Sequence, residues 1–441
     1  MKHTLVPLTI LLLLAGCAVN RTATPAHGEP ASMNSPINSI AESYVKLVLA
    51  VGQHDADYVD AYYGPPEWRA EAEAKKRPLA EIRSEAETLI ADLGTHPAAG
   101  GDELARLRHQ YLLRQLQAMV SRIDMLAGRK LTFDEESKAL YDAVAPTLDA
   151  AHFQRILDQL ETLVPGDGPL APRVEAFRQA LVIPRDRVDA VFKAAIDECR
   201  RRTLAHLTLP KEETFTVEYV TGKSWSAYNW YKGGFHSLIQ VNTELPIFID
   251  RAIDLACHEG YPGHHVYNVL LEKHLMRDRG WPEYSVYPLF SPQSLIAEGT
   301  ANFGIEVAFP GEQRTAFERE KLYPLAGLDP GKAERYSEVQ KLLQGLSYAG
   351  NEAARHYLNG EMSRQDAEAW LVRYALMSPE RAAQRVRFMD QYRSYVINYN
   401  LGQDLVRQYI ESRGGTADQP GKRWDEFTRL ISSPRLPSGL K

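Results

Sequence analysis

The chain has 441 residues, of which 44% are hydrophobic and 24% are charged, and its formal net charge at pH 7 is −6. This composition is ordinary for a folded soluble protein. The length is enough to bury a large core and to form more than one lobe. No run of like charge stands out, whereas nucleic-acid binding calls for a clustered basic patch, so we expect no nucleic-acid partner.

The N-terminus carries a targeting signal. A mainly apolar run from Leu5 to Leu14 follows a basic start and is too short to span a bilayer, which is typical of a signal peptide. The run ends in Leu14-Ala-Gly-Cys17, which resembles a bacterial lipobox. The resemblance implies a signal peptide at residues 1–16 and lipid on Cys17, which would anchor the protein to a membrane. Ala18 after the cysteine favours, by analogy, the outer membrane of a Gram-negative cell, with the protein facing the periplasm. An ordinary secretory signal is the alternative.

A tether and a helical lobe follow the signal. Residues 17–36 are rich in Pro, Ala, Ser and Thr without an apolar period, which predicts a flexible tether. From about residue 37 to 205 the apolar spacing is helical almost throughout, and Thr132-Phe-Asp-Glu135 is a capping box that opens one helix. One predicted helical face is formed by Leu112, Leu113, Leu116, Met119, Val120, Ile123 and Leu126.

A short β-rich segment comes next. Residues 215–220 alternate between apolar and polar side chains, as in a half-buried strand. Residues 225–231 and 235–241 are also strand-like, and the Lys-Gly-Gly sequence between them predicts a β-hairpin. His236 falls in this hairpin and could line a groove, although a single histidine in a strand is more often structural.

The segment His258-Glu-Gly-Tyr-Pro-Gly-His-His265 holds the residues that a zinc hydrolase needs. Imidazoles hold the metal, and a glutamate takes a proton from the attacking water. The usual spacing is H-E-x-x-H on one helical face, whereas here the second histidine comes later, at His264 or His265. Pro262 breaks the helix and Gly263 permits unusual backbone angles, so we expect a bulge that loops out two or three residues. Either histidine could then return to the ligand position.

A third metal ligand is predicted downstream. Ser291-Pro292 is a good helix start, with serine as the N-cap and proline in the first turn. Glu298 lies in this helix on a mainly apolar face, near Leu295 and Ala301. A carboxylate in such surroundings is costly unless it is paired or bound to a metal. Glu298 is therefore our choice for the third ligand, although an ordinary carboxylate with a basic partner would give the same pattern.

The C-terminal part of the chain is helical again from about residue 332 to 412, with helix starts at Ser363 and Ser378. Tyr392, Tyr395 and Tyr399 follow at helical spacing, which most often indicates packing. We expect one domain at residues 37–435. It would consist of an N-terminal helical lobe at about 37–205, a metal-site region at about 206–310 and a C-terminal helical lobe at about 311–435.

Two cysteines, Cys199 and Cys257, remain once Cys17 carries lipid. They could pair in an oxidising periplasm, but two cysteines do not make a disulfide framework. Cys257, next to His258, could equally be a small buried apolar residue, so the sequence leaves the pairing open.

The motif at residues 258–265, followed by Glu298-Gly-Thr-Ala-Asn-Phe-Gly304, resembles a bacterial family of unknown function, many members of which are predicted lipoproteins. The resemblance covers most of the chain, because it extends to Asp60-Ala-Tyr-Tyr-Gly-Pro-Pro-Glu-Trp68, Leu131-Thr-Phe-Asp-Glu-Glu136 and Tyr399-Asn-Leu-Gly402. The family is in turn similar to the helical gluzincin metallopeptidases, which include thimet oligopeptidase, angiotensin-converting enzyme and the thermostable carboxypeptidases.

This resemblance implies a metal site. Gluzincins have H-E-x-G-H followed by a ligand glutamate on the next long helix, and alignment of Gly-His with Gly-His puts His264 and Glu298 on the second and third ligand positions. His265 is then an alternate ligand or a group that supports a ligand. The resemblance also implies that Tyr395 or Tyr399 stabilises the oxyanion. The predicted hairpin could pair with an extended peptide by strand addition, or it could be a covering sheet.

We therefore predict a mainly α-helical, two-lobed, gluzincin-like metallopeptidase with a small β-hairpin beside the active site. His258, His264 and Glu298 would hold one zinc ion per chain, and Glu259 would be the general base in the hydrolysis of peptide or other amide bonds. The expected partners are a peptide substrate and, through the lipid on Cys17, a membrane. The alternative is a non-catalytic envelope lipoprotein, a binding or scaffold module on a peptidase-like fold, which would have no need for an intact general base.

Overall fold

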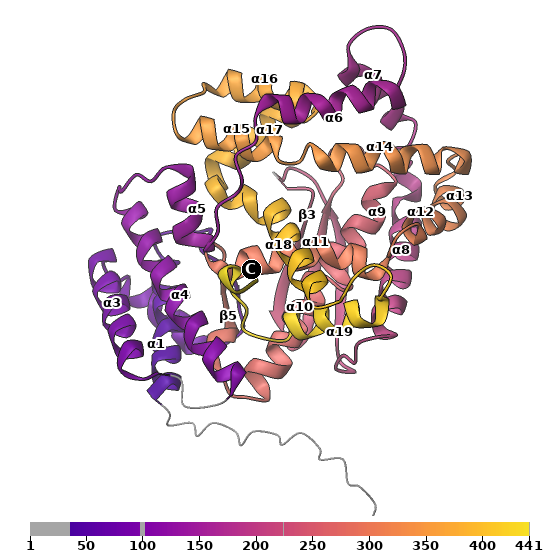
Figure 1. Ribbon diagram of the computed structural model, residues 1–441. Helices are drawn as coiled ribbons and strands as arrows, with labels where there is room; N and C mark the ends of the chain where they lie inside the picture. The colour runs from indigo at the N-terminus through magenta and orange to yellow at the C-terminus, as the bar shows by residue number, and fades with distance from the viewer. Residues whose placement is uncertain (1–35, 98–101, 224, 441) are drawn as a thin grey trace, which may run out of the picture.

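The structure is a computed structural model that describes residues 36–97, 102–223 and 225–440 (Figure 1). The predicted signal peptide, Cys17 and all of the predicted tether but its last residue lie outside these ranges. Within them the chain is mainly helical and has two small sheets, which confirms the predicted fold class. None of the helices in the described ranges is long and apolar enough to cross a membrane.

The N-terminal part of the structure is built from helices. The predicted face of the helix at residues 103–126 is buried at Leu112, Leu116 and Met119. The predicted capping box is also present, because Thr132 and Glu135 each accept a hydrogen bond from the other's backbone N–H. The helices are α1 (Pro36–Val51), α2 (Pro66–Lys75), α3 (Leu79–Thr95), α4 (Glu103–Leu126), α5 (Phe133–Tyr141), α6 (Ala150–Leu163), α7 (Leu170–Gln179) and α8 (Val188–Leu204).

The β-rich segment forms a three-stranded sheet with the order β2-β4-β3. Its strands are β2 (Thr214–Val220), β3 (Ala227–Gly233) and β4 (His236–Asn242). β3 and β4 are antiparallel and form the predicted hairpin, whereas β2 pairs with β4 in parallel. The turn of the hairpin uses left-handed backbone at Gly233 and Gly234, with φ angles of 76° and 63°, which glycine adopts without strain. A second antiparallel sheet joins β1 (Val59–Tyr62) to β5 (Val286–Pro288).

The elements that carry the predicted ligands follow the sheet. α9 (Asp250–Leu255) continues into η2 (Ala256–Gly260), a π-helical turn, and α10 (His264–Leu271) and η3 (Glu272–Arg277) come after a short break. α11 (Pro292–Ala308) begins where the sequence predicts. Ser291 occupies its N-cap position, but the hydroxyl donates to the carbonyl of Pro288 at 2.8 Å and does not cap the helix.

The C-terminal part is again helical, and the predicted starts at Ser363 and Ser378 are both N-caps that accept a backbone hydrogen bond. α6 packs against α14 and α16 in a separate apolar cluster. Helices from the N-terminal and C-terminal parts of the chain therefore lie side by side at the top of Figure 1. The C-terminal helices are α12 (Gln313–Phe317), η5 (Glu318–Leu322), α13 (Tyr323–Ala326), α14 (Ala333–Gly345), α15 (Ala349–Leu358), α16 (Arg364–Tyr374), α17 (Pro379–Tyr392), η7 (Arg393–Val396), α18 (Ile397–Ser412) and α19 (Pro420–Ile431).

Candidate metal centre

Three side chains from three elements converge on one point. His258 lies in η2, His264 lies at the start of α10, and Glu298 lies in α11. The Nε2 atoms of the two histidines are 3.1 Å apart, and Glu298 Oε2 lies 3.3 Å from Nε2 of His258 and 3.7 Å from Nε2 of His264. One potential ligand atom of each residue lies within 4.8 Å of the other two. Two imidazoles and a carboxylate are a donor set that suits zinc.

A break in the helix brings His264 back to His258. The peptide bond between Tyr261 and Pro262 is cis, and α10 begins two residues later. A Cβ atom at Gly263 would lie 1.9 Å from the carbonyl oxygen of His258, so only glycine fits at this position. The bulge that the Pro-Gly sequence predicts is therefore present. On a continuous helix, His258 and His264 would be almost two turns apart, and the bulge brings them together.

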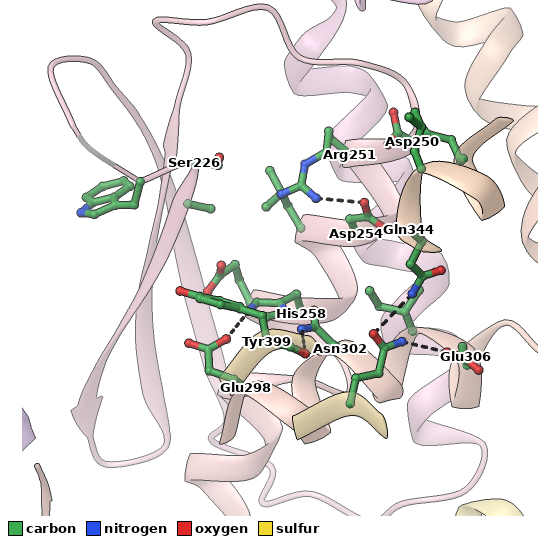
Figure 2. A pocket seen from close by; sticks show the side chains of 18 of the residues that line it. Ser226, Asp250, Arg251, Asp254, His258, Glu298, Asn302, Glu306, Gln344 and Tyr399 are labelled. Carbon is green, nitrogen blue, oxygen red and sulfur yellow. Dashed lines mark hydrogen bonds and ion pairs between the residues drawn. The ribbon is translucent and has the colours of Figure 1, made fainter. Parts of the chain in front are cut away.

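A chain of hydrogen bonds orients the imidazole of His258 (Figure 2). The side-chain amide of Asn302 donates to the backbone carbonyl of Tyr399 at 3.0 Å, which leaves its oxygen facing His258. That oxygen lies 2.9 Å from Nδ1 of His258 and can only accept a hydrogen bond. Nδ1 therefore carries a proton, and Nε2 is the nitrogen that faces His264 and Glu298. This is the arrangement of a metal-binding histidine with a supporting acceptor behind it.

Glu298 has one satisfied and one unsatisfied oxygen. The Tyr395 hydroxyl donates to Oε1 at 2.8 Å, whereas Oε2 is buried and has no hydrogen-bond partner among the described residues. Burial raises the pKa of Glu298, but the imidazoles of His258 and His264 outweigh it and hold this pKa well below its usual range. Burial likewise lowers the pKa of His258, but Glu298 raises it to about 9. The cluster thus favours positive charge between its three side chains. A divalent cation would supply this charge when it replaces the proton on His258.

His265 takes no part in this cluster. It is fully buried, its Nδ1 lies 2.9 Å from the Ser237 hydroxyl, and its Nε2 lies 3.0 Å from Oε2 of Glu213. Glu213 also accepts a hydrogen bond from the Tyr261 hydroxyl at 2.6 Å. Both ring nitrogens of His265 are therefore occupied. Of the two histidines that the sequence leaves open, His264 lies in the cluster that could hold a metal ion, whereas His265 lies in a separate hydrogen-bond network beside the bulge.

Glu259 follows the first ligand directly and lines the same cavity. It is 5% exposed, and none of the side chains in the described ranges forms a hydrogen bond or an ion pair with its carboxylate. Its backbone carbonyl accepts a hydrogen bond of 2.7 Å from the side chain of Asn229 in β3. The backbone of Glu259 is thus held against the sheet while its carboxylate stays available.

The two predicted tyrosines differ in their surroundings. Tyr395 is buried and its hydroxyl is bonded to Glu298, so it positions a ligand. Tyr399 lines the cavity, and its hydroxyl has no hydrogen-bond partner in the part of the chain that the structure describes. Their rings lie 5.8 Å apart in an edge-to-face arrangement. Burial raises the pKa of both phenols, so both remain protonated at neutral pH.

The structure adds residues that the sequence does not single out. Asp60 of β1 lines the cavity and accepts a hydrogen bond from the Tyr228 hydroxyl of β3. Burial raises the pKa of Asp60 to about 6, against the opposing effects of Tyr228 and His264. Asp60 falls within a segment that resembles the bacterial family, but nothing in its spacing to residue 258 predicts that the two would meet. The sequence shows Asn302 only as part of the motif from Glu298 to Gly304 and does not predict its contact with His258.

The candidate ligands His258, His264 and Glu298 line one cavity of about 1150 Å³. The same cavity is lined by Glu259, Asn302, Tyr395, Tyr399, Asp60 and Tyr228, but not by His265. Its walls come from β1, the edge strand β3, η2, α11, α14, α17 and α18. His236, which could have lined a groove, is not among the cavity residues. The cavity is large enough for several residues of a peptide.

Cys257 packs away from the metal cluster. It and Cys199 of α8 are both fully buried, and their Sγ atoms lie 2.8 Å apart without a disulfide bond. Cys257 thus anchors η2 against α8, as a small buried residue would.

The chain has distant similarity to several solved structures. No family model matches the chain, and no curated protein matches it. Among solved structures, the chain is similar to a provisionally assigned lipoprotein from Colwellia psychrerythraea, with a TM-score of 0.49 and 13% identity over 82% of this chain and 68% of that one. A provisionally assigned lipoprotein of unknown function from Shewanella oneidensis has a TM-score of 0.41 and 12% identity over 90% and 82% of the two chains. An M32 carboxypeptidase from Deinococcus radiodurans R1 has a TM-score of 0.35 and 14% identity over 89% of each chain.

Proposed function

We propose that this protein is a zinc-dependent peptidase with His258, His264 and Glu298 as metal ligands. The observation that supports this most strongly is the convergence of two imidazoles and a buried, half-satisfied carboxylate on one point in a large cavity. Glu259, whose carboxylate has no partner among the described side chains, lines the same cavity, and its charge raises the pKa of His258. A metal held for structure alone would have no use for such a carboxylate or for an open cavity.

Different residues would carry out different steps of the reaction. A zinc ion, when bound, supplies Lewis acidity that polarises a carbonyl and lowers the pKa of water. Glu259 takes the proton from the attacking water and passes it to the leaving amine. Asn302 holds the imidazole of His258 in the tautomer that leaves Nε2 unprotonated.

Tyr399 is our candidate for the donor that stabilises the oxyanion. Its hydroxyl faces the cavity without a described partner, whereas the hydroxyl of Tyr395 is committed to Glu298. A half-buried phenol with a raised pKa stays a hydrogen-bond donor throughout the reaction.

The edge of β3 supports a peptide as substrate. Residues 227–229 line the cavity and lie at the open edge of the sheet, and Asn229 is bonded to the backbone of Glu259. An extended peptide that adds to this edge would run past the general base. We therefore propose peptides bound in an extended form as substrates.

The lipobox-like sequence at residues 14–17 supports a location in the cell envelope. We propose that Cys17 carries lipid and tethers the protein to the outer membrane, facing the periplasm. Intact-mass analysis of the protein purified from cells should show acyl chains on the wild type and none on Cys17→Ser.

The mechanism is tested by Glu259→Gln, with Glu306→Gln as the matched control. Glu306 lies on α11 and lines the same cavity, but it pairs with Arg407. Zinc-loaded wild type and Glu306→Gln should cleave members of a peptide library, and Glu259→Gln should bind as much zinc but lose turnover by a factor of about 10³ or more. Equal turnover in Glu259→Gln would overturn the mechanism. Full zinc occupancy with no turnover in any wild-type assay would favour the non-catalytic binding module.

A further inference from the structure

One arginine of the cavity stands apart from the others. Arg385 of α17 lines the cavity, and no carboxylate of the described residues forms an ion pair with it. Its guanidinium lies instead near two aromatic rings, 4.9 Å from the ring centre of Phe388 and 5.9 Å from that of Tyr399. A cation in this setting has lost part of its water without gaining an anion.

Other cavity arginines show that pairing is the common arrangement. Arg251 and Arg314 both contact Asp254, at 2.9 and 2.8 Å (Figure 2 shows the first pair), and Arg407 pairs with Glu306. Arg314 also pairs with Glu318 at 2.8 Å, so each of these cations has a carboxylate partner within the fold.

Two further arginines, Arg178 and Arg381, also form no ion pair within the described part of the chain, but they differ from Arg385 in their surroundings. Both lie over the ring of Phe248, at 4.2 and 5.7 Å, and the charges of Glu175 and Asp250 act on Arg381. Burial lowers the pKa of Arg385, and Tyr399 counteracts this effect. Because an arginine keeps its proton at any physiological pH, Arg385 remains a cation without a counter-ion among the described residues.

The position of Arg385 relates it to the candidate metal centre. Its guanidinium lies beside the ring of Tyr399, that ring lies 5.8 Å from the ring of Tyr395, and the Tyr395 hydroxyl lies 2.8 Å from Oε1 of Glu298. Two aromatic side chains therefore separate Arg385 from a metal ligand. An anion bound by Arg385 would belong to a residue close to the bond that is cleaved.

We propose that Arg385 is the subsite for a carboxylate of the substrate, so that the peptides acted on carry a negative charge near the scissile bond. A guanidinium presents a planar fork of N–H donors that matches both oxygens of a carboxylate. That carboxylate is either the C-terminal group of the peptide or the side chain of an aspartate or glutamate. That the bound peptide is a substrate rests on the proposed function, but its binding can be measured without turnover.

The test uses zinc-loaded Glu259→Gln protein and three fluorescently labelled peptides. These are tetra-alanine with a blocked N-terminus and a free C-terminus, the same peptide as a C-terminal amide, and a blocked Ala-Ala-Glu-Ala amide. Fluorescence anisotropy gives the affinity of each peptide. Arg385→Gln and Arg385→Lys are compared with Arg381→Gln, which removes a guanidinium one helical turn away, and thermal unfolding confirms that each variant is folded.

We expect one of the two charged peptides to bind about tenfold more tightly than the uncharged amide, and we expect Arg385→Gln to remove this preference. Arg385→Lys should keep part of it, and Arg381→Gln should keep all of it. Preference for the free C-terminus identifies the terminal carboxylate, and preference for the glutamate peptide identifies a side chain. Equal affinity for all three peptides, no binding of any of them, or a preference that survives in Arg385→Gln would overturn the proposal. Binding with this preference but without turnover in the wild type would leave the subsite standing and remove the peptidase.

Discussion

Gly299 of α11 and Gly402 of α18 are in direct backbone contact. A Cβ atom on Gly299 would lie 2.5 Å from the carbonyl carbon and oxygen of Gly402, and one on Gly402 would lie 2.7 Å from the carbonyl oxygen of Leu295. Glu298 precedes the first glycine, and Tyr399 lies one helical turn before the second. The contact between the glycines therefore sets the distance between the candidate metal ligand Glu298 and the tyrosine side of the cavity.

We expect Gly299→Ala and Gly402→Ala to push the two helices apart. Because the obstructing atoms belong to the backbone, the overpacking should cost about 1–3 kcal/mol of stability, and zinc affinity should fall with it. Gly94→Ala is the matched control, since its Cβ would meet nothing within 4 Å in α3. Urea unfolding and zinc titration of the three variants measure both effects. An unchanged zinc affinity in Gly299→Ala would show that the glycine contact does not position the site.

Asn302 should matter for zinc although it does not touch the ion site. Asn302→Leu removes the acceptor that fixes the tautomer of His258, so we expect zinc affinity to fall by about 10- to 100-fold. Gln344→Leu, which alters another cavity amide that is bonded only to Gln403, should leave the affinity unchanged. Competition with a chromophoric chelator gives both dissociation constants. Equal affinities in the two variants would contradict the assigned role.

The two adjacent histidines should give opposite phenotypes. His264→Ala should lose the zinc ion and keep most of its stability, because it removes a ligand at the cavity wall. His265→Ala should keep zinc but lose about 2–4 kcal/mol of stability, because it leaves a buried hole and removes a hydrogen-bond partner from both Glu213 and Ser237. Metal analysis and urea unfolding of both variants separate the roles. Loss of zinc in His265→Ala with zinc retained in His264→Ala would reverse the assignment.

Asp60 should make the metal-free protein less stable as the pH rises. Its pKa is about 6 in the folded protein and about 4 in an unfolded chain, so the folded state binds the proton more tightly. The folded state therefore loses stability between about pH 4 and pH 6, by about 1–2 kcal/mol after allowance for solvent screening. Asp60→Asn keeps an acceptor for Tyr228 and should remove this contribution. Urea unfolding across that pH range in the presence of a chelator makes the comparison, and identical pH slopes in the two proteins would contradict it.

The sequence predicts those parts of the structure that depend on local chemistry. The Pro-Gly bulge, the hairpin turn at Gly233 and Gly234, the capping box at Thr132 and the helix start at Ser363 each follow from backbone preferences of a few residues. The fold class follows for the same reason, since helical periodicity extends over most of the chain.

Contacts between distant segments could not be predicted in this way. Asp60, Tyr228 and Arg385 reach the cavity from three elements whose packing no local pattern encodes. The parallel pairing of β2 with β4 and the packing of α6 on α14 are likewise tertiary. The sequence cannot decide between His264 and His265 for the same reason. His265 is held by Ser237 and Glu213, which come from a distant strand and a distant loop.

The most direct test of the central claim is the metal content of the protein without its N-terminal signal, measured by mass spectrometry after zinc is supplied and excess removed. The account predicts about one zinc ion per chain in the wild type and in Glu259→Gln, and none in His258→Ala or Glu298→Ala. Wild-type protein that is folded but binds no zinc, or that binds as much as His258→Ala and Glu298→Ala do, would contradict it.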